Sequence, residues 1–547
     1  MEWLGGLDDW RFLKEGCRNP CATESHQLNS IRARQRIAIE IALLTLCALS
    51  VGCSGSVESV SPTQHPLVAQ YSLTSPCSGE FMVEFGPDRS YGRNTAPVTT
   101  RSWFHPASVF VAGMKASTAY HMRSQTQCSD GVRRTGDDLI FRTGPLPDTP
   151  FPTLTVSRPN PSPESPENAG IEMINIIAPN NTYMQAIFTD RDGNPIWYYP
   201  MPPDYSPQTI KLLGNGNMII CMVNGPNSLL REVDLAGNTI RELDIKALQQ
   251  KLQALGADFI PVNLHHDVLP LANGHVILLV NFGKDFTDLP GYPGTIQVLG
   301  DGLVDLDQNW DPVWTWNSFD YLDVNRHLDG LPDWTHANAI AYTDDGNLLL
   351  SMRHQSWVLK LDYSNGIGSG NVLWRLGYQG DFTLTEQGVP TDDPSAWFSY
   401  QHFPSIVGQD GQQATIAIWD NGDNRVVNEK GDICQMFSNG VLPMCFSRAT
   451  VFKVDESTRL ADLLWAAPLQ YFGIWGGSIN QLSNGNVEFD LNAPLVPPNP
   501  DVSSVIQEVT QTESPQVVWE MQISPAAQHA YRAYRVPSLY PGVTWPY

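Results

Sequence analysis

The chain has 547 residues, which is longer than one ordinary domain unless part of it is built from repeats. Hydrophobic residues make up 42% and charged residues only 16%, while 43 Gly and 42 Pro supply turn chemistry for many short strands. The formal net charge of −24 argues against a nucleic-acid partner, because a phosphate backbone binds to a basic face. A small anionic substrate in a local positive pocket is still allowed.

Residues 1–53 have the pattern of an N-terminal extension that ends in a signal peptide. An arginine-rich stretch, 32–36, precedes the apolar run 41–51, which is too short to span a membrane. The run ends in Gly52–Gly55, which resembles a bacterial lipoprotein cleavage site with Cys53 as the lipidated residue. We therefore expect an exported, periplasmic protein that is anchored to the membrane only through this lipid. Plain secretory cleavage is the alternative.

Five of the nine cysteines lie in the part predicted to be exported, where disulfides persist. Cys77 and Cys128 form a candidate bridge within one small domain, and Cys434 with Cys445 would close a short loop. Cys221 is left over and is expected to be buried. No Cys-x-x-Cys spacing or neighbouring histidine suggests a metal site at these cysteines.

Residues 57–145 have the pattern of a small β-sandwich. The segment Gly113–Tyr120 resembles the turn and tyrosine corner of fibronectin-III-like domains. A Pro-rich stretch at 146–168 predicts a linker, and residues 169–547 then form the main domain. The strand-like runs of the sandwich are 67–73, 80–85, 109–111, 120–124 and 139–141.

The main domain repeats one pattern, in which two apolar strands flank a Gly-Asn type of turn and a later strand ends near Trp. The period is roughly 70 residues, so about six units fit, and we predict a six-bladed β-propeller rather than a WD40 array. The hairpins are predicted at 211–220, 267–277, 339–350 and 478–488, and the closing strands at Trp197, Trp314, Trp374 and Trp519.

Three histidines, His266, His336 and His402, each stand just before an apolar strand and a Gly turn. Equivalent positions on the inner strands of a propeller converge on its central channel, so these imidazoles are predicted to meet there. Because His265 and His266 are adjacent strand residues, only one of them can face the channel, and the spacing favours His266. The alternative is three unrelated histidines, each bound to a backbone carbonyl.

Arg353 follows the strand that pairs with the one after His336, which places it near the same channel. A guanidinium offers a fork of donors suited to sulfate, phosphate or carboxylate. The alternative is a surface arginine paired with Asp344 or Asp345. Strand alternation predicts that His354 points away from Arg353.

The stretch Ser351–Asp362 resembles the signature of bacterial arylsulfate sulfotransferases that use no nucleotide sulfate donor. The other segments that carry this resemblance follow in the family's order and are His265-His266-Asp267, Asp333-Trp-Thr-His336, Gln401-His402 and Trp419-Asp-Asn-Gly-Asp-Asn-Arg425.

The resemblance implies a periplasmic six-bladed propeller that moves a sulfuryl group from a phenolic sulfate ester to a phenol by a ping-pong mechanism. His402 would be the nucleophile that becomes a sulfohistidine, and His266, His336 and Arg353 would bind the sulfuryl oxygens. Another imidazole would take the proton of the acceptor phenol. No cofactor is implied, and the chain contains neither a GxxxxGK[ST] nor an HExxH motif.

Two other classes remain open: a metal-dependent propeller hydrolase or lyase, and a non-catalytic binding lipoprotein. The set of three histidines and Arg353 favours the transferase, because a binding module has no need of all four. The sequence leaves the natural substrates open, and it allows a homo-oligomer without predicting one. Candidates for lining an aryl pocket are Trp397, Phe398, Tyr400, Tyr471, Phe472 and Trp475.

Overall fold

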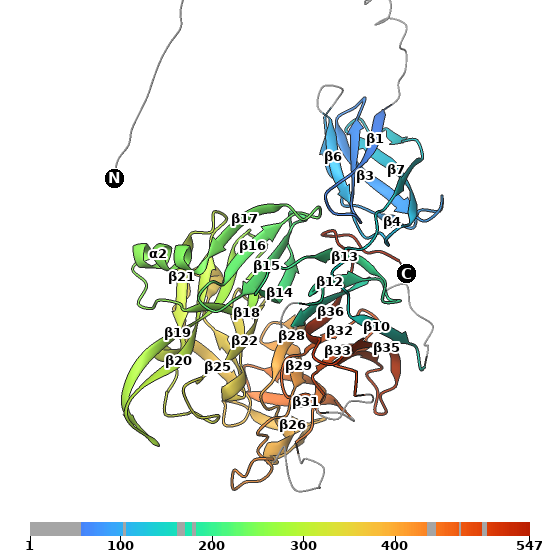
Figure 1. Cartoon of the computed structure of the whole chain (residues 1–547). Coiled ribbons are helices and arrows are strands. Elements are labelled where there is room, and N and C mark those ends of the chain that lie inside the picture. Colours follow the sequence, from blue (N-terminus) through green and yellow to red (C-terminus); the bar gives the residue numbers. More distant parts are fainter. Residues whose placement is uncertain are drawn as a thin grey trace, which may run out of the picture. The chain divides into compact units, whose positions relative to one another are not determined.

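The computed structural model describes residues 56–101, 106–160, 170–177, 182–434, 445–469, 472–494 and 500–546. The predicted signal peptide and Cys53 lie outside the described residues. Nearly all regular structure in the described ranges is β, which confirms the all-β prediction (Figure 1). No helix among these residues is long and apolar enough to cross a membrane.

The N-terminal region consists of two sheets with alternating burial. Tyr120 accepts a hydrogen bond from the backbone N–H of Lys115 at 2.9 Å, across the turn where a tyrosine corner was predicted. One sheet has the order β1 (Val57–Pro62), β2 (Ala69–Thr74), β6 (Ala107–Val111). The other contains β3 (Gly79–Gly86), β4 (Arg93–Asn94), β5 (Val98–Thr100), β7 (Ala119–Cys128), β8 (Arg133–Thr135) and β9 (Leu139–Arg142).

The remaining strands of the described residues form six sheets, which are antiparallel except where β26 pairs with β31 in parallel. The first combines β11 (Ile171–Ile177), β12 (Ala186–Thr189) and β13 (Pro195–Tyr199) with the C-terminal β36 (His529–Val536). The second is β14 (Ser206–Leu212), β15 (Met218–Val223), β16 (Leu229–Val233) and β17 (Thr239–Asp244). The third is β18 (Asn263–Pro270), β19 (Val276–Leu289), β20 (Tyr292–Leu306) and β21 (Pro312–Asn317).

The last three sheets follow in chain order. The fourth is β22 (Ala337–Tyr342), β23 (Leu348–Met352), β24 (Trp357–Leu361) and β25 (Val372–Leu376). The fifth is β28 (His402–Asp410), β29 (Gln413–Asp420), β30 (Arg448–Asp455) and β31 (Leu460–Pro468), extended by β26 (Thr383–Glu386) and β27 (Val389–Pro390). The sixth is β32 (Ser478–Gln481), β33 (Val487–Asn492), β34 (Ser504–Val509), β35 (Val517–Ser524) and β10 (Thr153–Ser157).

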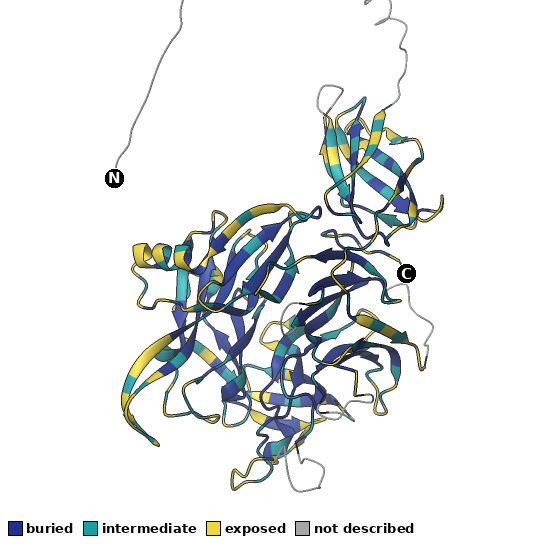
Figure 2. Cartoon of the chain, in the orientation of Figure 1, coloured by how far each residue is buried: buried dark blue, intermediate teal, exposed yellow. Residues whose placement is uncertain are grey.

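One strand of each sheet contacts its counterparts in the two neighbouring sheets. The contacts run from β14 through β18, β22, β28 and β32 to β36, which contacts β14 again. The six sheets therefore form a closed cycle, called the ring below, and these six inner strands surround its centre. Figure 2 shows that buried residues concentrate along the strands of the ring, whereas the far end of the β19–β20 hairpin is exposed.

Part of the predicted linker 146–168 is a strand, since β10 pairs with β35. Its sequence, Thr-Leu-Thr-Val-Ser, alternates polar and apolar residues, but proline-rich flanks obscured the pattern.

Tryptophans on outer strands join neighbouring sheets through their indole N–H groups. Trp197 donates to the carbonyl of Leu235, Trp316 to that of Gly370, and Trp519 to that of Arg191. Each indole thus buries a large apolar surface and satisfies its one polar atom at the same time. Trp374 is an exception, since its buried Nε1–H has no hydrogen-bond partner among the described residues.

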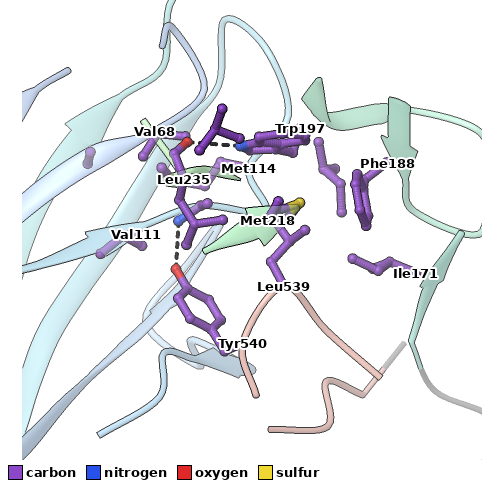
Figure 3. Close-up of a cluster of buried hydrophobic side chains, with 14 of the residues drawn as sticks. Val68, Val111, Met114, Ile171, Phe188, Trp197, Met218, Leu235, Leu539 and Tyr540 are labelled. Carbon is purple, nitrogen blue, oxygen red and sulfur yellow. Dashed lines mark hydrogen bonds between the residues drawn. The ribbon is translucent and has the colours of Figure 1, made fainter. Parts of the chain in front are cut away.

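A hydrophobic cluster connects the N-terminal sheets to the ring (Figure 3). Val68 and Val111 lie in one cluster with Phe188 and Trp197 of the first ring sheet. Tyr540, from the C-terminal tail, accepts a hydrogen bond from the backbone N–H of Ala112 at 2.8 Å, and its hydroxyl donates to the carbonyl of Phe110 at 2.7 Å.

Both predicted disulfides are present, and Cys221 is buried as a free thiol. Cys77–Cys128 spans 51 residues and Cys434–Cys445 spans 11. In the chain-entropy account, a bridge stabilises more when the loop that it closes is longer.

We predict that replacing Cys77 and Cys128 together by serine lowers the free energy of unfolding by about 4 kcal/mol, and replacing Cys434 and Cys445 by about 3 kcal/mol. Urea unfolding of the oxidised protein and the two double variants measures both losses. Unchanged stability in both variants would contradict the two bridges.

Candidate functional site

His266 and His336 are held in the left-handed backbone region, with φ of 56° and 48°. His266 lies where the strand register shifts, between Leu264 and Val268, and His336 directly precedes β22, whose register shifts between Ala337 and Ala339. Such conformations cost about 1–3 kcal/mol each and persist only where the surroundings enforce them. The ring therefore fixes the direction of these two imidazoles at an energetic cost.

The predicted histidines meet around a residue that the sequence did not point to, Tyr531 of β36. The ring centre of His266 lies 4.9 Å from that of His336 and 5.7 Å from that of Tyr531. His402 lies 6.2 Å from Tyr531 on another side. His265 contacts the group only through His266, since its Nδ1 lies 2.6 Å from His266 Nδ1 and its Nε2 lies 3.1 Å from Asp301.

Arg353 joins this group through contacts that hold it in place. Its Nη2 donates to Asp423 Oδ2 at 3.0 Å and to the carbonyl of Ile474 at 3.0 Å, and its guanidinium lies 5.0 Å from the ring centre of Tyr400. Its buried Nε–H has no hydrogen-bond partner among the described residues. Burial raises the pKa of Asp423 to about 7, although the arginine opposes this shift. Arg353 thus retains an unused donor.

Arg353 does not pair with Asp344 or Asp345, the surface partners that the sequence allowed. Asp345 pairs with Lys360 at 2.7 Å, and the backbone N–H of Asp344 binds the Gln409 side chain.

The prediction that His354 points away from Arg353 is wrong. His354 Nε2 lies 2.7 Å from Arg353 Nη1, and its ring stacks on His336 with centres 4.5 Å apart. The reason is local: residues Arg353–Gln355 form a 3₁₀ turn, so the alternation of a strand does not apply to them.

The tautomer of His402 follows from its neighbour Asn421. The Asn421 amide nitrogen donates to the carbonyls of Gly473 and Gly476, which leaves its oxygen facing His402 Nδ1 at 2.7 Å. An amide oxygen only accepts, so Nδ1 carries the proton and Nε2 carries the lone pair. Nε2 accepts a long hydrogen bond of 3.3 Å from the backbone N–H of Gly476. His402 is therefore poised as a nucleophile or base through Nε2.

Two of the site imidazoles are uncharged. Burial lowers the pKa of His402 well below its ordinary value, and nearby Arg353 lowers it further. Burial likewise lowers the pKa of His266, with His265 and His336 adding to the effect. Both imidazoles are therefore neutral at neutral pH.

A buried charge cluster lies next to the imidazoles. Asp267 is 2.7 Å from Lys211 Nζ and 3.1 Å from Arg532 Nη1, so one carboxylate faces two cations. The two cations share one carboxylate, so the cluster keeps a net positive charge. This charge can attract a sulfate-like group to the neutral imidazoles.

Asp333, His336 and His354 are close enough for their ligand atoms to suggest a metal site. The contacts argue against this use. Asp333 binds His336 Nδ1 at 2.5 Å, while the two nitrogens of His354 contact Arg353 and the carbonyl of Asp333. A cation would also lie beside the Arg353 guanidinium, so we assign no metal to these residues.

The candidate aryl-pocket residues divide into groups. Trp397, Phe398 and Tyr400 line one cavity of about 280 Å³. Trp475 stacks against Tyr531, with ring centres 6.4 Å apart. Phe472 packs against Cys434 and Cys445, and Tyr471 lies outside the described residues.

Sequence reasoning missed several residues that contact the site. Asp333, Asn421 and Asp423 lie inside the segments quoted for the family resemblance. The signal for them was a polar side chain within the same segments, which can pair with a site histidine or arginine. Tyr531 lies outside those segments, on the strand that completes the first sheet from the far end of the chain. No local signal marks it.

Solved structures overlap the chain only weakly. Drosophila Plexin A in complex with Semaphorin 1b is 12% identical, with a TM-score of 0.26 over 64% of this chain and 54% of that chain. The S. cerevisiae core factor is 9% identical, with a TM-score of 0.24 over 68% and 61%. An ACO/RPE65 chimera is 10% identical, with a TM-score of 0.31 over 88% and 95%. No curated protein matches the chain.

The arylsulfotransferase (ASST) family model matches residues 132–535, which covers most of the chain and includes His266, His336, Arg353, His402 and Tyr531. The chain belongs to the arylsulfotransferase family.

Proposed function

We propose that this protein transfers a sulfuryl group from a phenolic sulfate ester to a phenol through a sulfohistidine at His402. The main support is that His402 presents a neutral Nε2 lone pair beside two buried donors without partners, Arg353 Nε and the Tyr531 hydroxyl. Unsatisfied buried donors are costly, and a bound sulfuryl group would satisfy them.

In the first half-reaction, His402 Nε2 attacks the sulfur of the donor ester. The bond between sulfur and the aryl oxygen breaks, and the phenolate leaves with the electron pair. Arg353, His266 and the Tyr531 hydroxyl surround the three remaining oxygens and stabilise their charge, as clamps do in phosphoryl transfer. His336 is assigned to the second half-reaction instead of to these oxygens, because its Nδ1–H faces Asp333 and its Nε2 carries a lone pair.

In the second half-reaction, the oxygen of an acceptor phenol attacks the sulfur of sulfohistidine. The bond between sulfur and Nε2 breaks, its electron pair returns to His402, and the phenol gives up its proton to a base. Donor and acceptor use the site in turn, so the kinetics are ping-pong.

The proposal extends to architecture and location. Six sheets in a closed cycle agree with a six-bladed β-propeller, and the two N-terminal sheets agree with a fibronectin-III-like sandwich. Both disulfides agree with export to the periplasm, with a lipid anchor at Cys53.

We predict that wild-type protein releases nitrophenol from 4-nitrophenyl sulfate when phenol is added, and that His402→Ala lowers turnover by about 1000-fold or more, because it removes the nucleophile. His275→Ala is the control, since this imidazole pairs with Asp305 away from the site. Release that needs no phenol and stops with a chelator would indicate a metal hydrolase instead. No release from a panel of aryl sulfates would favour a binding protein.

We predict that Tyr531→Phe affects activity and stability in opposite directions. The Arg532 guanidinium lies 5.3 Å from this ring, yet the buried hydroxyl has no hydrogen-bond partner among the described residues. Its removal should stabilise the fold by about 1 kcal/mol and slow turnover by about 100-fold, because a transition-state donor is lost.

Tyr534→Phe on the same strand is the matched control, because its hydroxyl donates to the carbonyl of Ile210 at 3.0 Å. It should lose about 1 kcal/mol of stability and keep its activity. Full activity in Tyr531→Phe would remove this tyrosine from the site.

A further inference from the structure

The three site histidines differ in the partner that orients them. His402 is held by the amide of Asn421, and His266 Nδ1 lies 2.6 Å from His265 Nδ1. His336 alone of the three is in direct contact with a carboxylate, since its Nδ1 lies 2.5 Å from Asp333 Oδ2.

A carboxylate at Nδ1 has two effects on an imidazole. It accepts the Nδ1 proton, which leaves the lone pair on Nε2, and it stabilises the positive ring that forms when Nε2 takes a second proton. An amide or a second imidazole supplies only the first effect. The Asp333–His336 pair is therefore the better base, whereas Asn421 leaves His402 a neutral nucleophile.

The surroundings of His336 allow contact with a substrate. Its side chain is 28% exposed, whereas His402 is buried, and no hydrogen bond to its Nε2 occurs among the described residues. The titratable and charged groups that face it are Asp333, His266, His354, His402 and Arg353.

We infer that Asp333 is a positioning residue that makes His336 the base for the acceptor phenol, an inference that rests on the proposed function. The phenol O–H bond breaks and its proton goes to His336 Nε2. The phenol oxygen forms its bond to sulfur, and the electron pair of the S–Nε2 bond returns to His402. The Asp333 carboxylate balances the positive charge on His336.

The two half-reactions should differ in their dependence on Asp333. Donor cleavage expels a phenolate and needs no base, so it should not depend on Asp333. Acceptor attack needs a base only when the phenol is protonated, so a more acidic phenol that is already ionised at the assay pH should bypass Asp333.

The test is a rapid-mixing assay of Asp333→Asn with 4-nitrophenyl sulfate. We expect a burst of one nitrophenol per active site, as in wild type, because the first half-reaction is intact. Turnover with unsubstituted phenol should fall by about 100-fold, and with an acidic, ionised phenol by about tenfold or less. Asp333→Glu should recover part of the loss.

Asp329→Asn is the matched control. This aspartate lies four positions earlier, is similarly exposed, and contacts His354 Nε2 at 3.3 Å rather than His336. It should leave the dependence on the acceptor unchanged.

An equal loss with all acceptors, or no loss, would overturn the role of Asp333. Absence of a burst in wild type would instead overturn the sulfohistidine mechanism, so the two failures are distinguishable.

Discussion

The structure depends on the closure of the ring by its C-terminal strand. β36 pairs with β11 and completes the first sheet with residues from the other end of the chain. Arg535 fixes this seam, because its guanidinium binds Glu172, Glu488 and Glu508 at 2.7–3.1 Å in a buried cluster. Loss of one partner from such a cluster would leave uncompensated buried charge, which is strongly destabilising.

The same strand supplies the centre of the site. Tyr531 lies between His266 and His402, and Arg532 binds Asp267 beside them. Closure of the ring and formation of the site therefore depend on the same strand. This also explains how a protein with a net charge of −24 keeps a positive centre: its cations are buried and face a shared carboxylate.

The site side chains differ in the residues that hold them by hydrogen bonds. An amide orients His402, the proposed nucleophile, and a carboxylate orients His336. Arg353 is fixed by Asp423 and by the carbonyl of Ile474, with one N–H left unused. The reactive groups thus need little rearrangement when substrate arrives, which is the condition for efficient electrostatic catalysis.

Local sequence signals predicted the elements that local interactions determine. The Gly turns at 213–217 and 343–347 form the hairpins β14–β15 and β22–β23. Three of the predicted closing strands, those of Trp197, Trp314 and Trp374, are outermost in their sheets, whereas that of Trp519 is covered by β10. The meeting of His266 and His336 followed from their equal places in the repeat.

Contacts between residues far apart in the sequence could not be predicted from these local signals. Tyr531 reaches the site only because β36 pairs with the distant strand β11. Residues 153–157 form the strand β10 because they pair with β35. His354 was misplaced because a 3₁₀ turn replaced the expected strand end.

The most direct measurement is the mass of the peptide that contains His402 after brief reaction with 4-nitrophenyl sulfate in the absence of acceptor, followed by an alkaline quench. The mechanism predicts that this peptide gains the mass of one SO₃ group on His402 and that added phenol removes it. A peptide that stays unmodified while nitrophenol is released, or a sulfuryl group on another residue, would contradict His402 as the nucleophile.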